Sequence, residues 1–318
     1  MATYILRRII QAIFVLIIVS IIVFVLVRLL PGDPILMIVS QSTLSETSQE
    51  EIDRLRHQYG LDRSLIVQYV DWLTDVVRGD FGNSIVLREP VIKQISKRVP
   101  ITFNLSIISF ILSLMIGVPA GVISAVRRGK WQDTLVTILA NLGITIPVFW
   151  LGIMMIYCFA LYLGWLPVYG YTSPFVDFTK SIKQMIMPVA CLAIFPVASL
   201  MRQTRSSMLE VMQQDYVRTA WSKGLKERQV IIKHALKNGL IPVITLLGIS
   251  FSHIIGGSVL VETVFNIPGV GRMAVNAVFS QDYSILQGFT FLIAAFILIV
   301  NLVVDISYGW LDPRIRYG

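Results

Sequence analysis

Charged residues are scarce in this chain: Asp, Glu, Lys and Arg together make up 14% of its 318 residues. Soluble domains carry about 25% charged residues. Hydrophobic residues reach 55%, the mean hydropathy is +0.73, and the apolar residues are gathered in long runs. This distribution excludes a single large soluble core and indicates an all-α integral membrane protein that crosses the membrane several times.

Cysteine and the common catalytic motifs are also rare or missing. Cys158 and Cys191 both lie in apolar segments, which excludes a disulfide framework, and no Cys/His spacing suits zinc. The sequence has no phosphate-binding loop, no His-Glu-x-x-His and no Gly-x-Ser-x-Gly. We therefore expect no catalytic residue, metal site or cofactor in this chain. If its activity requires ATP and magnesium, we expect partner chains to bind them.

The net charge of +8 would suggest a nucleic-acid partner if the protein were soluble. In membrane proteins, however, basic residues gather in the cytoplasmic loops. Aromatic and basic residues are not interleaved here in the pattern that stacks bases. We therefore expect membrane lipid, and not nucleic acid, near these basic residues.

Six apolar segments are long enough to cross about 30 Å of hydrocarbon. They lie near 9–29, 101–126, 134–163, 185–204, 240–261 and 286–310. Gly143 and Pro147 predict a kink in the third segment. Pro188 and Pro196 interrupt the fourth, which is the weakest of the six predicted spans.

The basic residues predict the orientation of these segments. The arginine pair at 7–8 precedes the first apolar run, which is too long for a signal peptide and is followed by no cleavage site, so it stays as an anchor. With the N-terminus inside, the segments 127–130, 202–237 and 314–316 hold most basic residues of the short loops, whereas the long loop 31–99 translocates regardless of its charge. Both termini are predicted to face the cytoplasm.

Two helices are predicted in the long outer loop. Residues 47–50 (Thr-Ser-Gln-Glu) form a capping box, which opens a helix that ends near Gly60. Apolar residues then recur at helical spacing from Ser64 to Arg78, and Gly79 follows. A folded cap of this kind either docks a soluble binding protein or forms a lid on the chain's own helices, and the sequence favours neither.

One polar, basic stretch between two apolar segments has the pattern helix–glycine–helix, near 208–239. Gly224 is predicted to adopt a positive φ and to turn the chain between two short helices. Thr219 and Ala220 are predicted to form a shallow patch that a partner surface can approach. The alternative is an amphipathic element that lies on the membrane surface.

This stretch resembles the EAA loop of the membrane subunits of ABC importers, in the version found in the peptide and nickel permease family. The general pattern has Glu-Ala-Ala, then Gly, then Ile-x-Leu-Pro. Here residues 218–220 read Arg-Thr-Ala, Gly224 is in place, and residues 234–237 read His-Ala-Leu-Lys. The last departure is typical of the peptide branch. Further motifs of this family occur in order at 30–34, 60–62, 79–82, 164–167, 261–271 and 312–316.

The resemblance implies an importer core of five helices at 100–311, preceded by an N-terminal span at 1–30 and an outer loop at 31–99, and followed by a cytoplasmic tail at 312–318. It also implies an inner membrane of a bacterium or archaeon, a related second permease chain, two ATPase subunits and an external solute-binding protein. The ATPase-coupling residues that it implies are Asp215, Tyr216, Arg218, Thr219, Ala220, Gly224, Leu225, His234, Leu236 and Asn238.

Several polar residues lie in or near the apolar segments. Asn141, Thr145, His253 and Asp305 are candidates for a wet translocation path, because ionisable and polar groups in a membrane usually face a cavity or a partner. The alternative is hydrogen bonding between helices, which is common for Asn and Thr. A lone histidine is weak evidence for a metal.

The function that the resemblance implies is a permease that forms the path for di- or oligopeptides and couples it to separate ATPase subunits. The same architecture would also suit nickel-chelate, glutathione-like or opine-like solutes. An intramembrane enzyme would need paired catalytic residues inside the spans, and a secondary transporter would usually show internal repeats. The sequence shows neither of these features.

Overall fold

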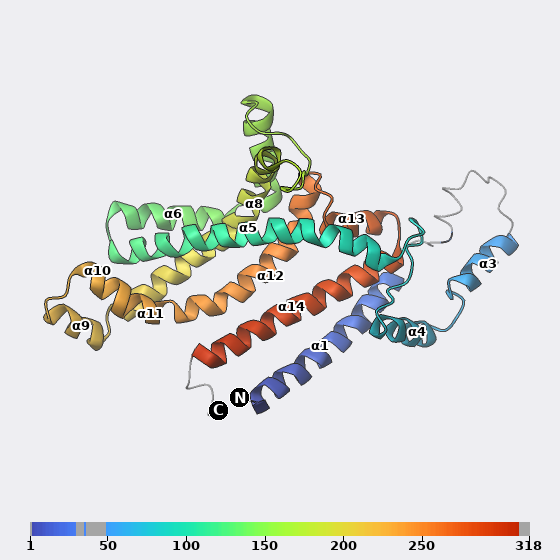
Figure 1. Cartoon of the computed structure of the whole chain (residues 1–318), viewed down its shortest axis with the longest axis horizontal. Coiled ribbons are helices and arrows are strands. Elements are labelled where there is room, and N and C mark those ends of the chain that lie inside the picture. The colour runs from blue at the N-terminus through green and yellow to red at the C-terminus, as the bar shows by residue number, and fades with distance from the viewer. Residues whose placement is uncertain (1, 30–34, 36–48, 312–318) are drawn as a thin grey trace. The chain divides into compact units, whose positions relative to one another are not determined.

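The computed structural model describes residues 2–29, 35 and 49–311 (Figure 1). This part of the chain is helical, without a strand. Its helices are α1 (Ala2–Arg28), α3 (Gln49–Gln58), α4 (Leu65–Val77), α5 (Val91–Val126), α6 (Trp131–Thr145), α7 (Val148–Met155), η1 (Ile156–Tyr162), α8 (Phe178–Val211), α9 (Asp215–Ser222), α10 (Glu227–Gln229), η2 (Val230–Ala235), α11 (Leu236–Gly239), α12 (Ile241–Val264), α13 (Val270–Phe279) and α14 (Tyr283–Leu311).

The chain forms two compact units, and each is described by itself. The first holds residues 1–5, 102–268 and 300–318, and the second holds 6–101 and 269–299. The long helices α5 and α14 each run from one unit into the other.

Five helices of the described chain are long and apolar enough to cross a membrane. They are Ile5–Arg28, Val91–Val126, Phe178–Val211, Ile241–Val264 and Tyr283–Val304. They correspond to the first, second, fourth, fifth and sixth predicted spans, which are confirmed as helices. The all-α membrane class is confirmed with them.

The fourth predicted span is more regular than its sequence suggests. Helix α8 continues without a break through Pro188 and Pro196, both of which are buried. The predicted interruption is therefore wrong. Membrane helices tolerate proline when neighbouring helices cover the freed backbone groups, and α6, α7 and α12 pack against α8.

The third predicted span, 134–163, is not one straight helix. Helix α6 and the α7–η1 pair meet at an angle of 102°. The break lies at Ile146, which is extended (ψ 123°) immediately before Pro147. A residue before proline is forced out of the helical region, and proline lacks the N–H that would continue the helix. The kink was predicted at the right place. The bend of 102°, however, is larger than a single kinked helix implies.

Glycines allow α5 and α8 to pack very closely in the first unit. A Cβ atom on Gly121 would lie 2.6 Å from the Cβ of Thr204, and one on Gly117 would lie 2.8 Å from the Cβ of Leu200. Between membrane helices, association depends on such small-residue contacts, because lipid supplies no hydrophobic force to push the helices together. We call this contact of Gly117 and Gly121 with α8 the glycine seam.

In the second unit the predicted outer helices are present as α3 and α4. Gly60 and Gly79, which follow them, have φ of +64° and +85°. The first two residues of the predicted capping box lie outside the described residues.

Helix α4 is anchored to the membrane helices of its own unit. The Tyr69 hydroxyl hydrogen-bonds to Ser20 Oγ of α1 at 2.8 Å, and the rings of Tyr69 and Phe24 meet edge to face at 5.4 Å. Trp72 packs on Phe291 of α14 with 5.8 Å between ring centroids. One face of α4 therefore covers the chain's own helices, as the lid interpretation requires.

Candidate functional site

The segment between α8 and α12 folds as a compact helical element, which we call the loop element (residues 212–240). Helix α9 ends at Ser222, the chain turns at Gly224, and α10, η2 and α11 follow in immediate succession. Gly224 has φ +72°, so its predicted positive φ is confirmed. Figure 1 shows α9, α10 and α11 grouped together.

The loop element has a small apolar core of its own. Val217, Ala220 and Val230 are 0%, 4% and 1% exposed, and Val211 and Leu225 pack against them. Val217 and Ala220 share one face of α9 because they are three residues apart. The predicted patch of Thr219 with Ala220 is thus wrong for Ala220: its methyl group faces inward, and Leu225 is half-buried.

The opposite face of α9 is open. Asp215, Tyr216, Arg218, Thr219 and Trp221 are exposed. The one ion pair on this face, Arg218 to Asp215 at 3.7 Å, joins two well-exposed side chains and contributes little to stability. Around Gly224, a Cβ atom would meet no other atom of the chain within 4 Å. Tyr216, Trp221 and the Gly224 turn are therefore all accessible on this face.

Hydrogen bonding and packing connect the two halves of the loop element to each other and to the membrane helices. Asn238 Nδ2 donates to the Tyr216 hydroxyl at 2.8 Å. Leu236 packs against the cluster formed by Ala125 of α5 and Met208 of α8, and Gly239 lies directly against Met208. His234 is half-buried. The element is therefore held firmly on α5 and α8.

A buried ion pair near this element was not predicted. Asp133, in the first turn of α6, accepts hydrogen bonds from Arg205 Nε at 2.7 Å and Arg205 Nη2 at 3.0 Å. Ser124 Oγ and the backbone N–H of Gly129 donate to the same carboxylate at 2.6 and 3.0 Å. The side chains of Asp133 and Arg205 are 9% and 31% exposed. Together these bonds fix the α5–α6 turn to α8.

The sequence signals this pair only through Asp133, an acidic residue at the start of an apolar segment. Its partner Arg205 lies 72 residues later in the chain. A second unpredicted carboxylate is Glu262 of α12, which is fully buried and accepts a hydrogen bond from Thr102 Oγ1 of α5 at 2.6 Å.

The candidate path residues that the structure describes lie on two helices, Asn141 and Thr145 on α6 and His253 on α12. Asn141, Thr145 and His253 are all exposed, but the Thr145 hydroxyl donates to the backbone carbonyl of Asn141, four residues earlier on α6. The His253 ring lies 5.0 Å from the Phe195 ring of α8. The side chain of Asp305 lies outside the described residues. Among the residues that are described, no group of three His, Cys, Asp or Glu side chains could hold a metal ion.

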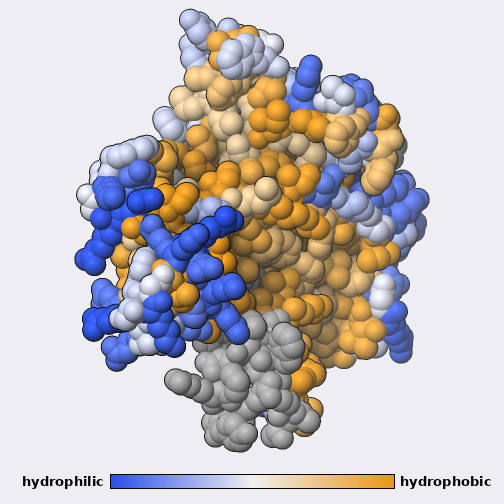
Figure 2. Space-filling model, turned by 60° about the vertical axis from the view of Figure 1, so that its left-hand side comes forward, coloured by the Kyte–Doolittle hydropathy of each residue, from blue (hydrophilic) through white to orange (hydrophobic). Residues whose placement is uncertain are grey.

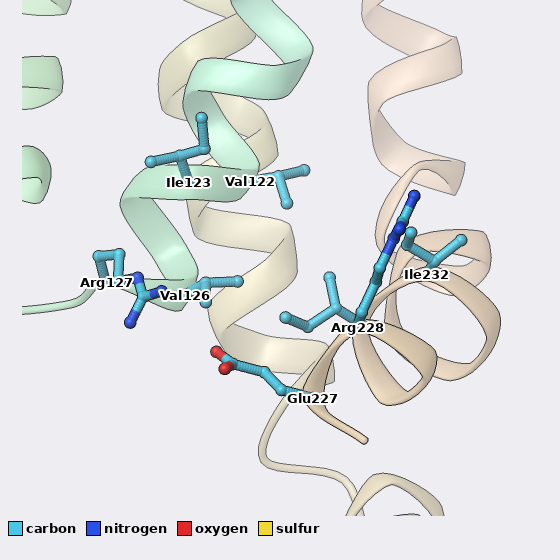
Figure 3. A pocket seen from close by; sticks show the side chains of 8 residues that line it. Val122, Ile123, Val126, Arg127, Glu227, Arg228 and Ile232 are labelled. Atoms are coloured by element: carbon cyan, nitrogen blue, oxygen red, sulfur yellow. The ribbon is translucent and has the colours of Figure 1, made fainter. Parts of the chain in front are cut away.

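The loop element has a hydrophilic surface. In Figure 2 the side of the molecule that carries α9 and α10 comes forward, and hydrophilic side chains are gathered there. A cleft separates the end of α5 from α10 and η2 (Figure 3). The arrangement suits an element at a membrane surface that presents one polar face to a partner.

Comparison with known proteins also identifies a membrane protein of a transport system. The family model described as "Binding-protein-dependent transport system inner membrane component" matches residues 117–317, and the model of the N-terminal part of such components matches residues 1–106. A putative peptide transport system permease protein of Brucella abortus (strain 2308) is 42% identical over 318 residues, which cover 100% of both chains.

Two further similarities extend this result. The oligopeptide transport system permease protein AppB of Bacillus subtilis (strain 168) is 40% identical over 320 residues and 100% of both chains. In structure, a chain of the MetNI methionine ABC transporter in an inward-facing conformation is similar with a TM-score of 0.58. That match covers 70% of this chain and 97% of the other at 16% sequence identity, so it supports the fold alone.

Proposed function

Because the chain belongs to the family of inner membrane components of binding-protein-dependent transport systems, we propose that it is the peptide-conducting permease subunit of an ABC importer. Its relatives at 40–42% identity over the whole chain are named as peptide and oligopeptide permeases, which supports peptides as its substrates. The observation that carries the coupling role is the exposed α9 face with the open Gly224 turn.

The geometry supports a mechanical role for the loop element. A partner surface that seats on Tyr216, Trp221 and Gly224 would push on an element whose own core is buried and whose second half packs on Met208 of α8. The element would then move as a body, and α8 and α5 would move with it. ATP-driven closure of the partner would in this way switch the path between outward and inward access.

The proposed assembly contains this chain, a related second permease chain, two ATPase subunits and an external solute-binding protein. ATP and magnesium would be held by the ATPase subunits. The test is co-purification of the tagged chain from its native membrane, followed by identification of the ligand on the binding protein encoded beside it. An ATPase subunit in the complex and a peptide on the binding protein support the proposal; a chain that never retains an ATPase would contradict it.

Topology gives the first prediction. Cysteines introduced at Glu50 on α3 and at Lys226 in the loop element, both exposed positions, should react with a membrane-impermeant maleimide from opposite sides of the membrane. The physical reason is the concentration of Lys and Arg in the short inside loops. Labelling is measured in intact cells and in inverted vesicles, in a background that lacks Cys158 and Cys191. Labelling of both sites from one side would contradict the proposed orientation.

The second prediction concerns the outer face of α4. Ile66 is 77% exposed, although the inner face of the same helix is anchored on α1 and α14. If this apolar face docks the binding protein, Ile66→Glu should lower binding-protein-dependent uptake several-fold, because a charge at an apolar contact must be desolvated. Protein level and melting temperature should stay unchanged.

The matched control for Ile66→Glu is Gln58→Glu, which adds the same charge at an exposed position of α3. It should leave uptake near the wild-type value. If the Ile66→Glu variant keeps wild-type uptake and wild-type affinity for the binding protein, the docking interpretation is contradicted. The outer helices then serve as a lid on the chain's own helices.

A further inference from the structure

A cleft lies beside the loop element, and none of its lining residues belongs to the α9 face that we propose for coupling. Its volume is about 360 Å³, and its walls come from the last turns of α5 and from α10 and η2. Val122, Ile123 and Val126 form one wall, and Ile231 and Ile232 form the other. Ligand pockets in proteins start at about 300 Å³. The cleft can therefore accept a small headgroup with the first carbons of an alkyl chain, but not a whole protein segment.

Three charged side chains complete the lining: Arg127, Glu227 and Arg228. None of them forms an ion pair with another residue in the described part of the chain. Two guanidinium groups and one carboxylate leave the cleft with one net positive charge. Figure 3 shows Glu227 extending below Val126, whereas Arg228 runs up beside Ile232 on the loop-element side of the cleft.

The position of the cleft limits what can enter it. Helix α5 qualifies as a membrane span by its length and composition and ends at Val126, so the cleft lies at one end of a membrane-spanning helix. A guanidinium beside apolar walls favours an anion that itself carries an apolar tail. Arg binds phosphate through two parallel hydrogen bonds. Basic pockets between membrane helices at a membrane surface are known to bind anionic headgroups.

We propose that this cleft binds one anionic phospholipid of the adjacent leaflet. Arg228 holds the phosphate, Arg127 adds positive charge at the rim, and the first carbons of the acyl chains lie against Val122 and Ile232. The lipid would add to the contact that Ala125 of α5 and Met208 of α8 already make with the second half of the loop element. This proposal rests on the membrane location of the chain and not on its substrate or its ATPase partner.

The test uses the full-length chain in mild detergent and native mass spectrometry, with phosphatidylglycerol and phosphatidylcholine as probes. The wild type should bind one phosphatidylglycerol in preference to phosphatidylcholine. Arg228→Gln should weaken phosphatidylglycerol binding about tenfold, which is the size of effect expected for a hydrogen-bonded charge. Arg228→Lys should recover part of it. Val122→Trp, which fills the cleft and leaves every charge in place, should also weaken it.

The matched control is Lys226→Gln, which removes a neighbouring exposed charge that does not line the cleft. It should change phosphatidylglycerol binding less than twofold. Equal losses in Lys226→Gln and Arg228→Gln, or no preference for phosphatidylglycerol in the wild type, would overturn the proposal. It is also overturned if Arg228→Gln lowers ATPase co-purification while lipid binding stays unchanged, because the cleft would then belong to the protein partner.

Discussion

A Gly224→Asp variant is expected to insert normally and to lose ATP-driven uptake. Gly224 has φ +72°, where an L side chain costs on the order of 1 kcal/mol. A Cβ atom there has open space, since apart from the chain neighbours nothing lies within 4 Å of it. With an ATPase subunit docked on this turn, as proposed, the new carboxylate would be an unpaired charge at the contact, which costs several kcal/mol. At about 1.4 kcal/mol per tenfold, ATPase affinity should fall by orders of magnitude.

Gly224→Asn separates the two contributions to this loss. Asparagine adopts the left-handed conformation more readily than most residues and carries no charge. It should therefore retain most of the ATPase subunit in pull-downs, whereas the Asp variant retains little. Uptake by proteoliposomes and the yield of co-purified ATPase are the two measurements. Wild-type values of both in the Asp variant would refute the coupling role of the loop element.

The second large effect is expected from Arg205→Ala. The substitution leaves Asp133 buried with only Ser124 and Gly129 as hydrogen-bond donors. Removing one partner of a buried ion pair costs about 3–5 kcal/mol, and the partial exposure of Arg205 places this case at the lower end. The variant should melt at a markedly lower temperature in detergent, and the α5–α6 turn should become sensitive to protease.

A double variant, Asp133→Asn with Arg205→Met, provides the control for Arg205→Ala. It removes both charges and keeps an oxygen that Ser124 can donate to. The double variant should regain most of the lost stability, because replacing a whole buried pair is often neutral. If it is no more stable than Arg205→Ala, the loss comes from packing of the arginine stem and not from the unpaired carboxylate.

The features that were predicted from the sequence depend on neighbouring residues. Apolar runs of sufficient length gave five of the spans, and helical spacing gave α4. The same holds for the turn at Gly224: only glycine adopts a positive φ without cost, and polar helical segments flank it. Each of these signals lies within a single turn or span, so one sequence is enough to identify it.

The features that were missed depend on tertiary contacts. Pro147 lies at a 102° break and is exposed, whereas Pro188 is buried and leaves α8 continuous, with α6, α7 and α12 packed against that helix. Ala220 was assigned to an open patch because its burial depends on Val230, which lies beyond the glycine turn. The pairing of Asp133 with Arg205 joins residues far apart in the chain. Pattern and spacing cannot identify such partners.

The glycine seam has a consequence for biogenesis. Helix α5 leaves the ribosome well before α8, which carries Thr204, the residue that covers Gly121. Until α8 inserts, the seam on α5 faces lipid and Asp133 has no arginine. An incomplete chain that ends before residue 178 therefore holds an uncovered groove on α5 and, at the α5–α6 turn, a carboxylate without its arginine. Both features that stabilise the finished protein are completed only when α8 is in place.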